Sequence, residues 1–184
     1  APKVRTVVVT GATGSGKTPL VGSVAEELQT RGFQVAGFIQ PAIVEGGAKI
    51  GFGIRDLATG ETADLARRVS EGSGRFGTSF TFFDRGFELG DRALTGIGPG
   101  SFLVIDELGP VELRGGGHWP AVERAVQSAA VAGLVVVFGA AWVAAAPGDD
   151  VSRTGRGEFP RLGSHREVRR IDREFYEGYR PYPE

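Results

Sequence analysis

The stretch TVVVTGATGSGKT at residues 6–18 decides the fold of this chain of 184 residues. Its first five residues are all β-branched, which predicts a short buried strand. The glycine-rich loop that follows leads into a helical pattern that stops at Gly32 and has five apolar residues on one face: Leu20, Val21, Val24, Ala25 and Leu28. A strand, a glycine loop and a helix in this order open an α/β unit.

Residues 11–18 (GATGSGKT) fit the pattern G-x-x-x-x-G-K-[ST] of a phosphate-binding P-loop, in the strand-to-helix context that this motif requires. The glycines let the backbone curl so that successive N–H groups and the helix N-terminus face phosphate oxygens. Lys17 is expected to neutralise the β- and γ-phosphates, and the Thr18 hydroxyl to ligate Mg²⁺. The residues predicted to bind the nucleotide are Gly11, Ala12, Thr13, Gly14, Ser15, Gly16, Lys17 and Thr18.

A dinucleotide-binding loop is the rival interpretation, because TGATGSG also resembles a Rossmann-type fingerprint. In the G-x-x-G-x-x-G spacing the third glycine would fall on Lys17, and in the G-x-G-x-x-G spacing Pro19 occupies the last place. The next predicted strand ends at Gln40 and Pro41, without the acidic residue that would hold a ribose hydroxyl. Hydride-transfer chemistry is therefore disfavoured.

Pro19 departs from the usual P-loop pattern. The amide after the Ser/Thr of such loops generally donates to the α-phosphate, and proline has no N–H to give. The residue before a proline also resists helical dihedral angles, which predicts mild strain at Thr18. We therefore expect weakened nucleotide binding in a fold that tolerates a proline in its first helical turn.

A second motif, FLVIDE at residues 102–107, consists of four apolar residues followed by two acids, the form of a Walker B strand. The buried strand carries Asp106 to the sheet edge where the P-loop also lies, so Asp106 is predicted to hold Mg²⁺ together with Thr18. Glu107 is predicted to project toward the γ-phosphate and to deprotonate a water. Acids often end strands, and it is the combination with a P-loop that favours a functional pair.

The other periodic segments predict a mostly parallel sheet with helices on both faces. Further strands are expected at 33–39, 101–106 and 134–138, and helices at 83–94 and from Pro120 onward. Strands at 50–57 and 62–66, joined by a turn at 58–61, predict an antiparallel insert. Residues 1–146 are expected to form one P-loop domain, to which the polar tail at 147–184 adds one docked helix.

Composition narrows the possible function classes. The chain has no Cys and two His, which excludes a disulfide framework and a thiolate nucleophile and leaves an oxygen-ligated metal site. Its 21 Lys and Arg against 22 Asp and Glu give no basic excess for nucleic acid, and no apolar run reaches membrane-spanning length. The N-terminus shows no leader pattern, so we expect a cytoplasmic protein without a nucleic-acid or membrane partner.

The segment DELGPVEL at 106–113 resembles the THEP-type nucleoside-triphosphatases, small P-loop NTPases of the RecA-like, additional-strand class. The P-loop, GFGI at 51–54 with TGE at 59–61, GRF at 74–76 and GHW at 117–119 resemble them too, over about residues 4 to 140. The resemblance implies Mg²⁺-dependent hydrolysis of nucleoside triphosphates to diphosphate and phosphate with broad base preference. It also implies Lys17 and Thr18 on phosphates and metal, Asp106 on the metal and Glu107 as the base.

Further residues have weaker claims. Glu112 could orient a catalytic group, and Arg55 or Arg75 could act as an arginine finger, although each is more commonly a surface charge. His118 and Trp119 could form a flexible rim over the site, unless Trp119 is simply a hydrophobic staple for the next helix. Core packing is favoured over base stacking for an aromatic cluster: Phe76, Phe80, Phe82, Phe83 and Phe87.

Two alternatives to hydrolysis stay open. A small-molecule kinase would need a second pocket and a lid with arginines, for which Arg153, Arg156 and Arg161 are candidates, whereas an acid placed as Glu107 favours water as the acceptor. A nucleotide-binding switch or assembly factor with little turnover is credible because of Pro19. The protein partner of such a factor is unknown.

Overall fold

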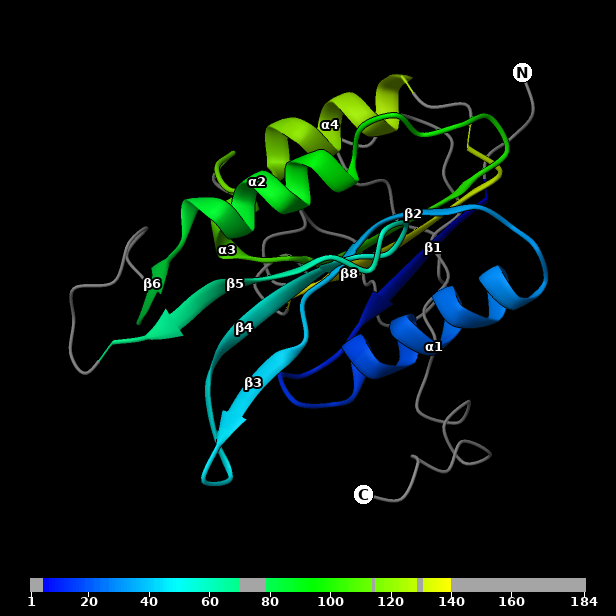
Figure 1. Ribbon diagram of the computed structural model, residues 1–184. Coiled ribbons are helices and arrows are strands. Elements are labelled where there is room, and N and C mark those ends of the chain that lie inside the picture. The colour runs from blue at the N-terminus through cyan, green and yellow to red at the C-terminus, as the bar shows by residue number, and fades with distance from the viewer. Residues whose placement is uncertain (1–4, 70–78, 114, 129–130, 140–184) are drawn as a thin grey trace, which may run out of the picture.

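The computed structural model describes residues 5–69, 79–113, 115–128 and 131–139 (Figure 1). In this part of the chain eight strands form one sheet in the order β1-β8-β7-β2-β4-β5-β6, and β3 pairs with β4. Helices cover both faces of this sheet. The α/β fold with a parallel core and an antiparallel insert is therefore confirmed.

The core of the sheet consists of four parallel strands, β1 (Arg5–Thr10), β8 (Gly133–Phe138), β7 (Phe102–Leu108) and β2 (Val35–Ile39). Val8 of β1 and Ile105 of β7 both pair with Val136 of β8. One strand thus separates the strand before the P-loop from the strand that carries the two acids. This is the additional strand of the predicted class.

The antiparallel insert extends the same sheet beyond β2. It contains β4 (Ala48–Asp56), β5 (Thr62–Arg68), β6 (Phe80–Phe82) and β3 (Ala42–Glu45). The predicted turn between β4 and β5 forms, and its backbone N–H groups at Ala58 and Thr59 donate to Oδ1 of Asp56 at 2.8 and 3.3 Å. The sequence did not predict β3 and β6, because strands of three or four residues carry too little periodicity to be recognised.

Helix α1 (Lys17–Thr30) covers one face of the sheet, and α2 (Asp84–Ala93) and α4 (Trp119–Ser128) cover the other (Figure 1). Because side chains alternate along a strand, β7 contributes to both layers. Val104 packs with Val21 and Ala25 of α1, whereas Leu103 packs in the cluster that contains Leu89 of α2. Each face of the parallel core is therefore covered by at least one helix.

Two glycines let α2 lie unusually close to its neighbours. A Cβ atom at Gly86 would lie 2.6 Å from the carbonyl oxygen of Asp64 in β5, and one at Gly90 would overlap Cε1 of His118. Real Cβ atoms do not make such contacts. The His118 ring occupies the space that Gly90 leaves and is fully buried.

Some predicted boundaries shift. The helix expected from Pro120 begins at Trp119, and the strand expected at 101–106 continues to Leu108, so both acids lie within β7. A short helix, α3 (Pro110–Leu113), follows and was not predicted. The expected domain limit at residue 146 and the tail helix lie outside the described residues.

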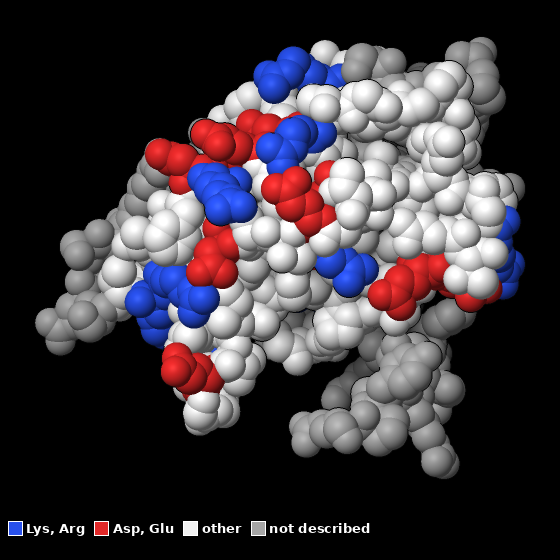
Figure 2. All heavy atoms as spheres, in the orientation of Figure 1, with Lys and Arg blue, Asp and Glu red and all other residues white. Residues whose placement is uncertain are grey.

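Charged side chains of both signs are interspersed on the surface. Figure 2 shows Lys and Arg beside Asp and Glu across the visible face. The described residues include exposed ion pairs, such as Arg92 with Glu61 at 2.6 Å and Arg67 with Asp64 at 2.8 Å. None of the described helices is long and apolar enough to span a membrane.

Candidate active site

The P-loop connects β1 to α1 at the edge where the parallel strands end. Gly14 and Gly16 have φ angles of 76° and 88°, a left-handed conformation that residues with side chains rarely adopt. Pro19 lies in the first turn of α1, where backbone N–H groups have no partner within the helix, and the first helical bond runs from Leu20 to the Gly16 carbonyl. The helix therefore accommodates Pro19 without losing a hydrogen bond, as predicted.

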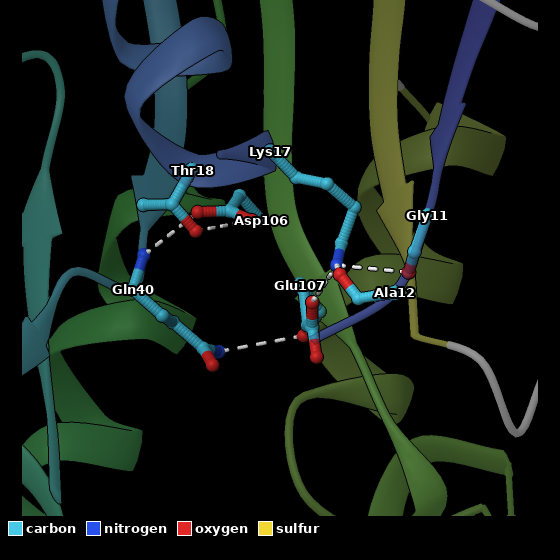
Figure 3. Close-up of polar contacts among 7 residues, drawn as sticks. All are labelled: Gly11, Ala12, Lys17, Thr18, Gln40, Asp106 and Glu107. Carbon is cyan, nitrogen blue, oxygen red and sulfur yellow. Dashed lines mark hydrogen bonds and ion pairs between the residues drawn. The ribbon is translucent and has the colours of Figure 1, made fainter. Parts of the chain in front are cut away.

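The Lys17 side chain turns back over the loop, as Figure 3 shows. Its ammonium donates to the carbonyl oxygens of Gly11 at 3.1 Å and Ala12 at 2.9 Å, and lies 3.8 Å from Oε2 of Glu107. The side chain is buried. The cation is thus held at the centre of the loop by weak neutral acceptors that a phosphate can replace.

Asp106 is fully buried and meets α1 through Thr18, which lies 88 residues earlier in the chain. Its Oδ1 accepts from the Thr18 hydroxyl at 3.2 Å, and its Oδ2 accepts from the backbone N–H of Gln40 at 3.2 Å (Figure 3). Burial raises the pKa of Asp106 to about 6, and these two hydrogen bonds oppose the rise. A nearby cation would stabilise the ionised form of this buried carboxylate.

Thr18 and Asp106 present oxygen ligands of the kind that Mg²⁺ prefers. The described residues contain no cluster of three or more His, Cys, Asp or Glu side chains that would make a metal cage. Mg²⁺ commonly binds through one or two protein oxygens, with phosphate and water completing its octahedron. The donor set fits an ion that arrives with a phosphate ligand.

Glu107 follows Asp106 and lies at the cavity beside Lys17, with 36% of its side chain exposed. Burial raises the pKa of Glu107, while the positive charges of Lys17 and Lys49 oppose the rise. The end of β8 leaves space for the carboxylate, because a Cβ atom at Gly139 would lie only 3.2 Å from Oε1 of Glu107. A partly exposed carboxylate in this place can hold and deprotonate a water.

Lys17, Thr18 and Glu107 border one cavity of about 610 Å³, whereas Asp106 is buried and contacts Thr18. The P-loop forms one wall and helix α1 continues it, while the opposite wall comes from the end of β2 and from β3 and β4. Thr13, Gly14, Gly16, Lys17 and Thr18 of the predicted loop line the cavity, as do Pro19 and Glu107. Of the remaining loop residues, Gly11 and Ala12 hold the Lys17 ammonium and Ser15 is exposed.

Three residues on the opposite wall were not predicted as site residues: Gln40, Lys49 and Phe52. Gln40 donates its backbone N–H to Asp106, and its side-chain amide donates to the Glu107 carbonyl at 3.5 Å (Figure 3). Lys49 lies with its ammonium 3.7 Å from the centre of the Phe52 ring. The available signal was that the chain has only three lysines, one of which is Lys17 of the P-loop.

Glu112 is buried and acts on the backbone near Glu107. Its Oε2 accepts from the N–H of Gly109 at 3.0 Å, and its Oε1 accepts from the N–H of His118 at 3.1 Å. The carboxylate therefore ties the chain segment just after Glu107 to the start of α4. This geometry fits the predicted role of orienting a catalytic group, exerted through the backbone.

Of the residues with weaker claims, some lie at the cavity, some lie in the core and some lie outside the described residues. Arg55 lines the cavity but lies 3.5 Å from Glu26 of α1, and Arg75 and the arginines after residue 146 lie outside the described residues. The flexible rim is a wrong prediction, because His118 and Trp119 are both buried. Phe82 and Phe87 pack against the core, Phe80 contacts Phe52, Phe83 is 38% exposed, and Phe76 lies outside the described residues.

This chain is similar to known nucleoside-triphosphatases. Residues 6–142 match the family model described as NTPase. The nucleoside-triphosphatase THEP1 of Methanopyrus kandleri is 37% identical over 132 residues, which cover 71% of this chain and 72% of that protein. The one from Thermofilum pendens is 38% identical over 123 residues, 66% and 67% of the two chains.

Two solved structures share the fold at low sequence identity. The solution structure of a human cancer-related nucleoside triphosphatase has a TM-score of 0.64 at 23% identity, covering 93% of this chain and 90% of that one. The crystal structure of THEP1 from Aquifex aeolicus has a TM-score of 0.64 at 20% identity, covering 94% and 92%. From the family model and the curated relatives together, the chain belongs to the THEP1 family of nucleoside-triphosphatases.

Proposed function

We propose that this protein hydrolyses nucleoside triphosphates to diphosphate and phosphate, with Mg²⁺ as cofactor and broad base preference. The observation that carries the proposal is that Lys17, Thr18 and Glu107 line one cavity, while the buried Asp106 binds the Thr18 hydroxyl. Lys17, Thr18 and Asp106 can bind phosphate or metal, and Glu107 can bind and deprotonate a water. Broad base preference is supported because the phosphates are common to all nucleoside triphosphates.

In the proposed reaction the loop amides and Lys17 bind the β- and γ-phosphates. Lys17 exchanges its carbonyl partners at Gly11 and Ala12 for phosphate oxygens, which are charged and therefore stronger acceptors. Thr18 and Asp106 would hold Mg²⁺, which neutralises charge on the β- and γ-oxygens when it is bound.

Glu107 is the proposed general base. A water oxygen attacks the γ-phosphorus, the bond from that phosphorus to the β,γ-bridging oxygen breaks, and Glu107 takes a proton from the water. The diphosphate leaves with the bridging oxygen. The position of Glu107 next to Lys17 supports water as acceptor over a second organic substrate.

A phosphate-release assay with ATP, GTP, CTP and UTP, each with and without Mg²⁺, tests the proposal. We expect release that depends on Mg²⁺, is similar for the four bases and is abolished in Lys17→Ala. Glu107→Gln should lower kcat by about 10² to 10⁴ and leave nucleotide affinity nearly unchanged, because a base acts on the reaction step.

Other results would favour the alternatives. Negligible release that is replaced by transfer to an added acceptor would establish a kinase. Tight binding without release or transfer would favour a nucleotide-dependent switch. An equal loss of affinity and turnover in Glu107→Gln would make Glu107 structural.

A further inference from the structure

We propose that Lys49 is a second catalytic cation, which contacts the γ-phosphate from the wall of the cavity opposite the P-loop. The proposal rests on the hydrolysis proposed above and assigns a residue that neither the P-loop nor the Walker B motif contains. Phosphoryl transfer spreads negative charge over the three equatorial oxygens of the γ-phosphate, and P-loop enzymes stabilise it with a cation beyond that of the loop. In this chain the cavity offers Lys49 for that task.

A β-bulge gives Lys49 its orientation. In the pairing of β3 with β4, Ile43 lies opposite Gly51 and Val44 lies opposite Lys49, so one extra residue of β4 stands between the two pairs. Strict alternation would place Lys49 and Phe52 on opposite faces of the strand. Instead the ammonium lies 3.7 Å from the centre of the Phe52 ring, and both residues line the cavity.

The surroundings of Lys49 suit an anion. Among the described residues no carboxylate lies within ion-pairing distance of its ammonium, whose close partner is the Phe52 ring. Lys49 is half-buried, and burial lowers its pKa, while the charge of Glu107 opposes that effect more than any other carboxylate does. The aromatic face holds the cation in place without neutralising it.

Lys17 and Lys49 act on Glu107 from two different elements, α1 and β4. Both positive charges lower the pKa of the Glu107 carboxyl, and the effect of Lys17 is the larger of the two. The γ-phosphate of a nucleotide in the P-loop lies next to Lys17 and in front of Glu107. A γ-phosphate next to Glu107 would therefore also be attracted by the positive charge of Lys49.

Arg55 is the other cation on this wall, and its geometry makes it the poorer candidate. Its guanidinium lies 3.5 Å from Oε1 of Glu26 on the exposed side of α1. The positive charges that lower the pKa of Glu107 are those of Lys17 and Lys49. The structure therefore assigns the second cation to Lys49.

The test compares Lys49→Met with Arg68→Met. Both substitutions keep an unbranched stem and remove a cation that lies over a phenylalanine ring, Phe52 for Lys49 and Phe80 for Arg68, but Arg68 is exposed and does not line the cavity. We expect Lys49→Met to lower kcat by about 10² to 10³ and Arg68→Met to change it by less than about twofold. Lys49→Arg should recover part of the loss.

A binding measurement separates this role from a structural one. Nucleoside diphosphate has no γ-phosphate, so its affinity should be the same within about twofold in wild type and Lys49→Met. Diphosphate with Mg²⁺ and aluminium fluoride, which mimics the γ-phosphoryl group in transfer, should bind wild type tightly and Lys49→Met at least about tenfold more weakly. Lys49→Gln, which keeps a polar head group, repeats both measurements if Lys49→Met folds poorly.

Three outcomes overturn the assignment: kcat within about threefold of wild type in Lys49→Met, equal loss of diphosphate and aluminium fluoride complex binding, or the same loss in Arg68→Met. Failure of the proposed hydrolysis would be visible separately, because wild type would then release no phosphate and Lys17→Ala would behave like wild type.

Discussion

Replacement of Glu112 by alanine tests how the segment after Glu107 is held. Glu112 is buried, and its two oxygens accept from the backbone N–H groups of Gly109 at 3.0 Å and His118 at 3.1 Å. Alanine would leave both donors buried without that acceptor. Because each unsatisfied buried donor costs about 1 to 3 kcal/mol, we expect Glu112→Ala to lower the free energy of unfolding by about 2 to 6 kcal/mol.

Such a loss is large beside the total stability of a domain, which is about 5 to 15 kcal/mol. Glu112→Gln keeps one oxygen as an acceptor but turns an amide N–H₂ toward the other backbone N–H. That one donor loses its acceptor, so the free energy of unfolding should fall by about 1 to 3 kcal/mol. Where Glu112→Gln stays folded, kcat should fall while diphosphate affinity is retained, because the loosened backbone begins two residues after Glu107.

Equilibrium unfolding in urea, followed by circular dichroism, measures the change, and Glu88→Ala is the control. Glu88 is an exposed acid on α2, so its replacement should change the free energy of unfolding by no more than about 0.5 kcal/mol. If Glu112→Ala unfolds at the same urea concentration as Glu88→Ala, the two hydrogen bonds do not stabilise the segment.

Three further predictions concern other elements. Pro19→Ala restores an N–H near the α-phosphate and should strengthen ADP binding about tenfold to a hundredfold in calorimetric titration. The reason is that a hydrogen bond to a charged group contributes about 1.5 to 3 kcal/mol. Equal affinities would mean that Pro19 is accommodated during binding. Burial raises the pKa of Asp106 from 3.8 to about 6, which disfavours its ionised form in the folded protein. Asp106→Asn should therefore stabilise the metal-free protein at pH 7, and the difference in stability from wild type should disappear below about pH 4. The same variant should raise the Mg²⁺ requirement of hydrolysis. A pH-independent difference would argue against a raised pKa. Gly86→Ala should destabilise the protein by about 1 to 3 kcal/mol in thermal unfolding although alanine favours helices, because its Cβ would meet the β5 backbone; a higher melting temperature would contradict that contact.

Much of the active site was predictable from the sequence because its parts are local. The P-loop occupies eight consecutive residues, and its glycines, lysine and threonine each follow from what a phosphate-binding turn requires. Asp106 and Glu107 end a run of apolar residues, which identifies a buried strand and the edge at which it stops. Two local patterns on parallel strands were enough to predict that these residues meet, because such strands end at a common edge.

Residues outside such motifs were not predictable in the same way. Glu112 looked like a surface acid after a strand, whereas it is buried and binds two backbone N–H groups. His118 next to three glycines looked like part of a flexible rim, whereas its ring fills the space above Gly90. The His118 ring lies against α2, and Glu112 binds backbone N–H groups on both sides of α3, so neither environment shows in the composition of the segment itself.

The sequence by itself determined the P-loop, the helix behind it, the apolar parallel strands and the pair of acids, because hydrophobic periodicity and motif spacing act within short windows of chain. Only the tertiary structure decided that β8 lies between β1 and β7, that Asp106 is shared by Thr18 and Gln40, and that Lys49 faces the cavity. The contacts of Asp106 join residues 88 and 66 positions apart, so they depend on strand order. The orientation of Lys49 depends on one extra residue in β4, and a bulge of that kind reverses the alternation of side chains without leaving a readable pattern in the sequence.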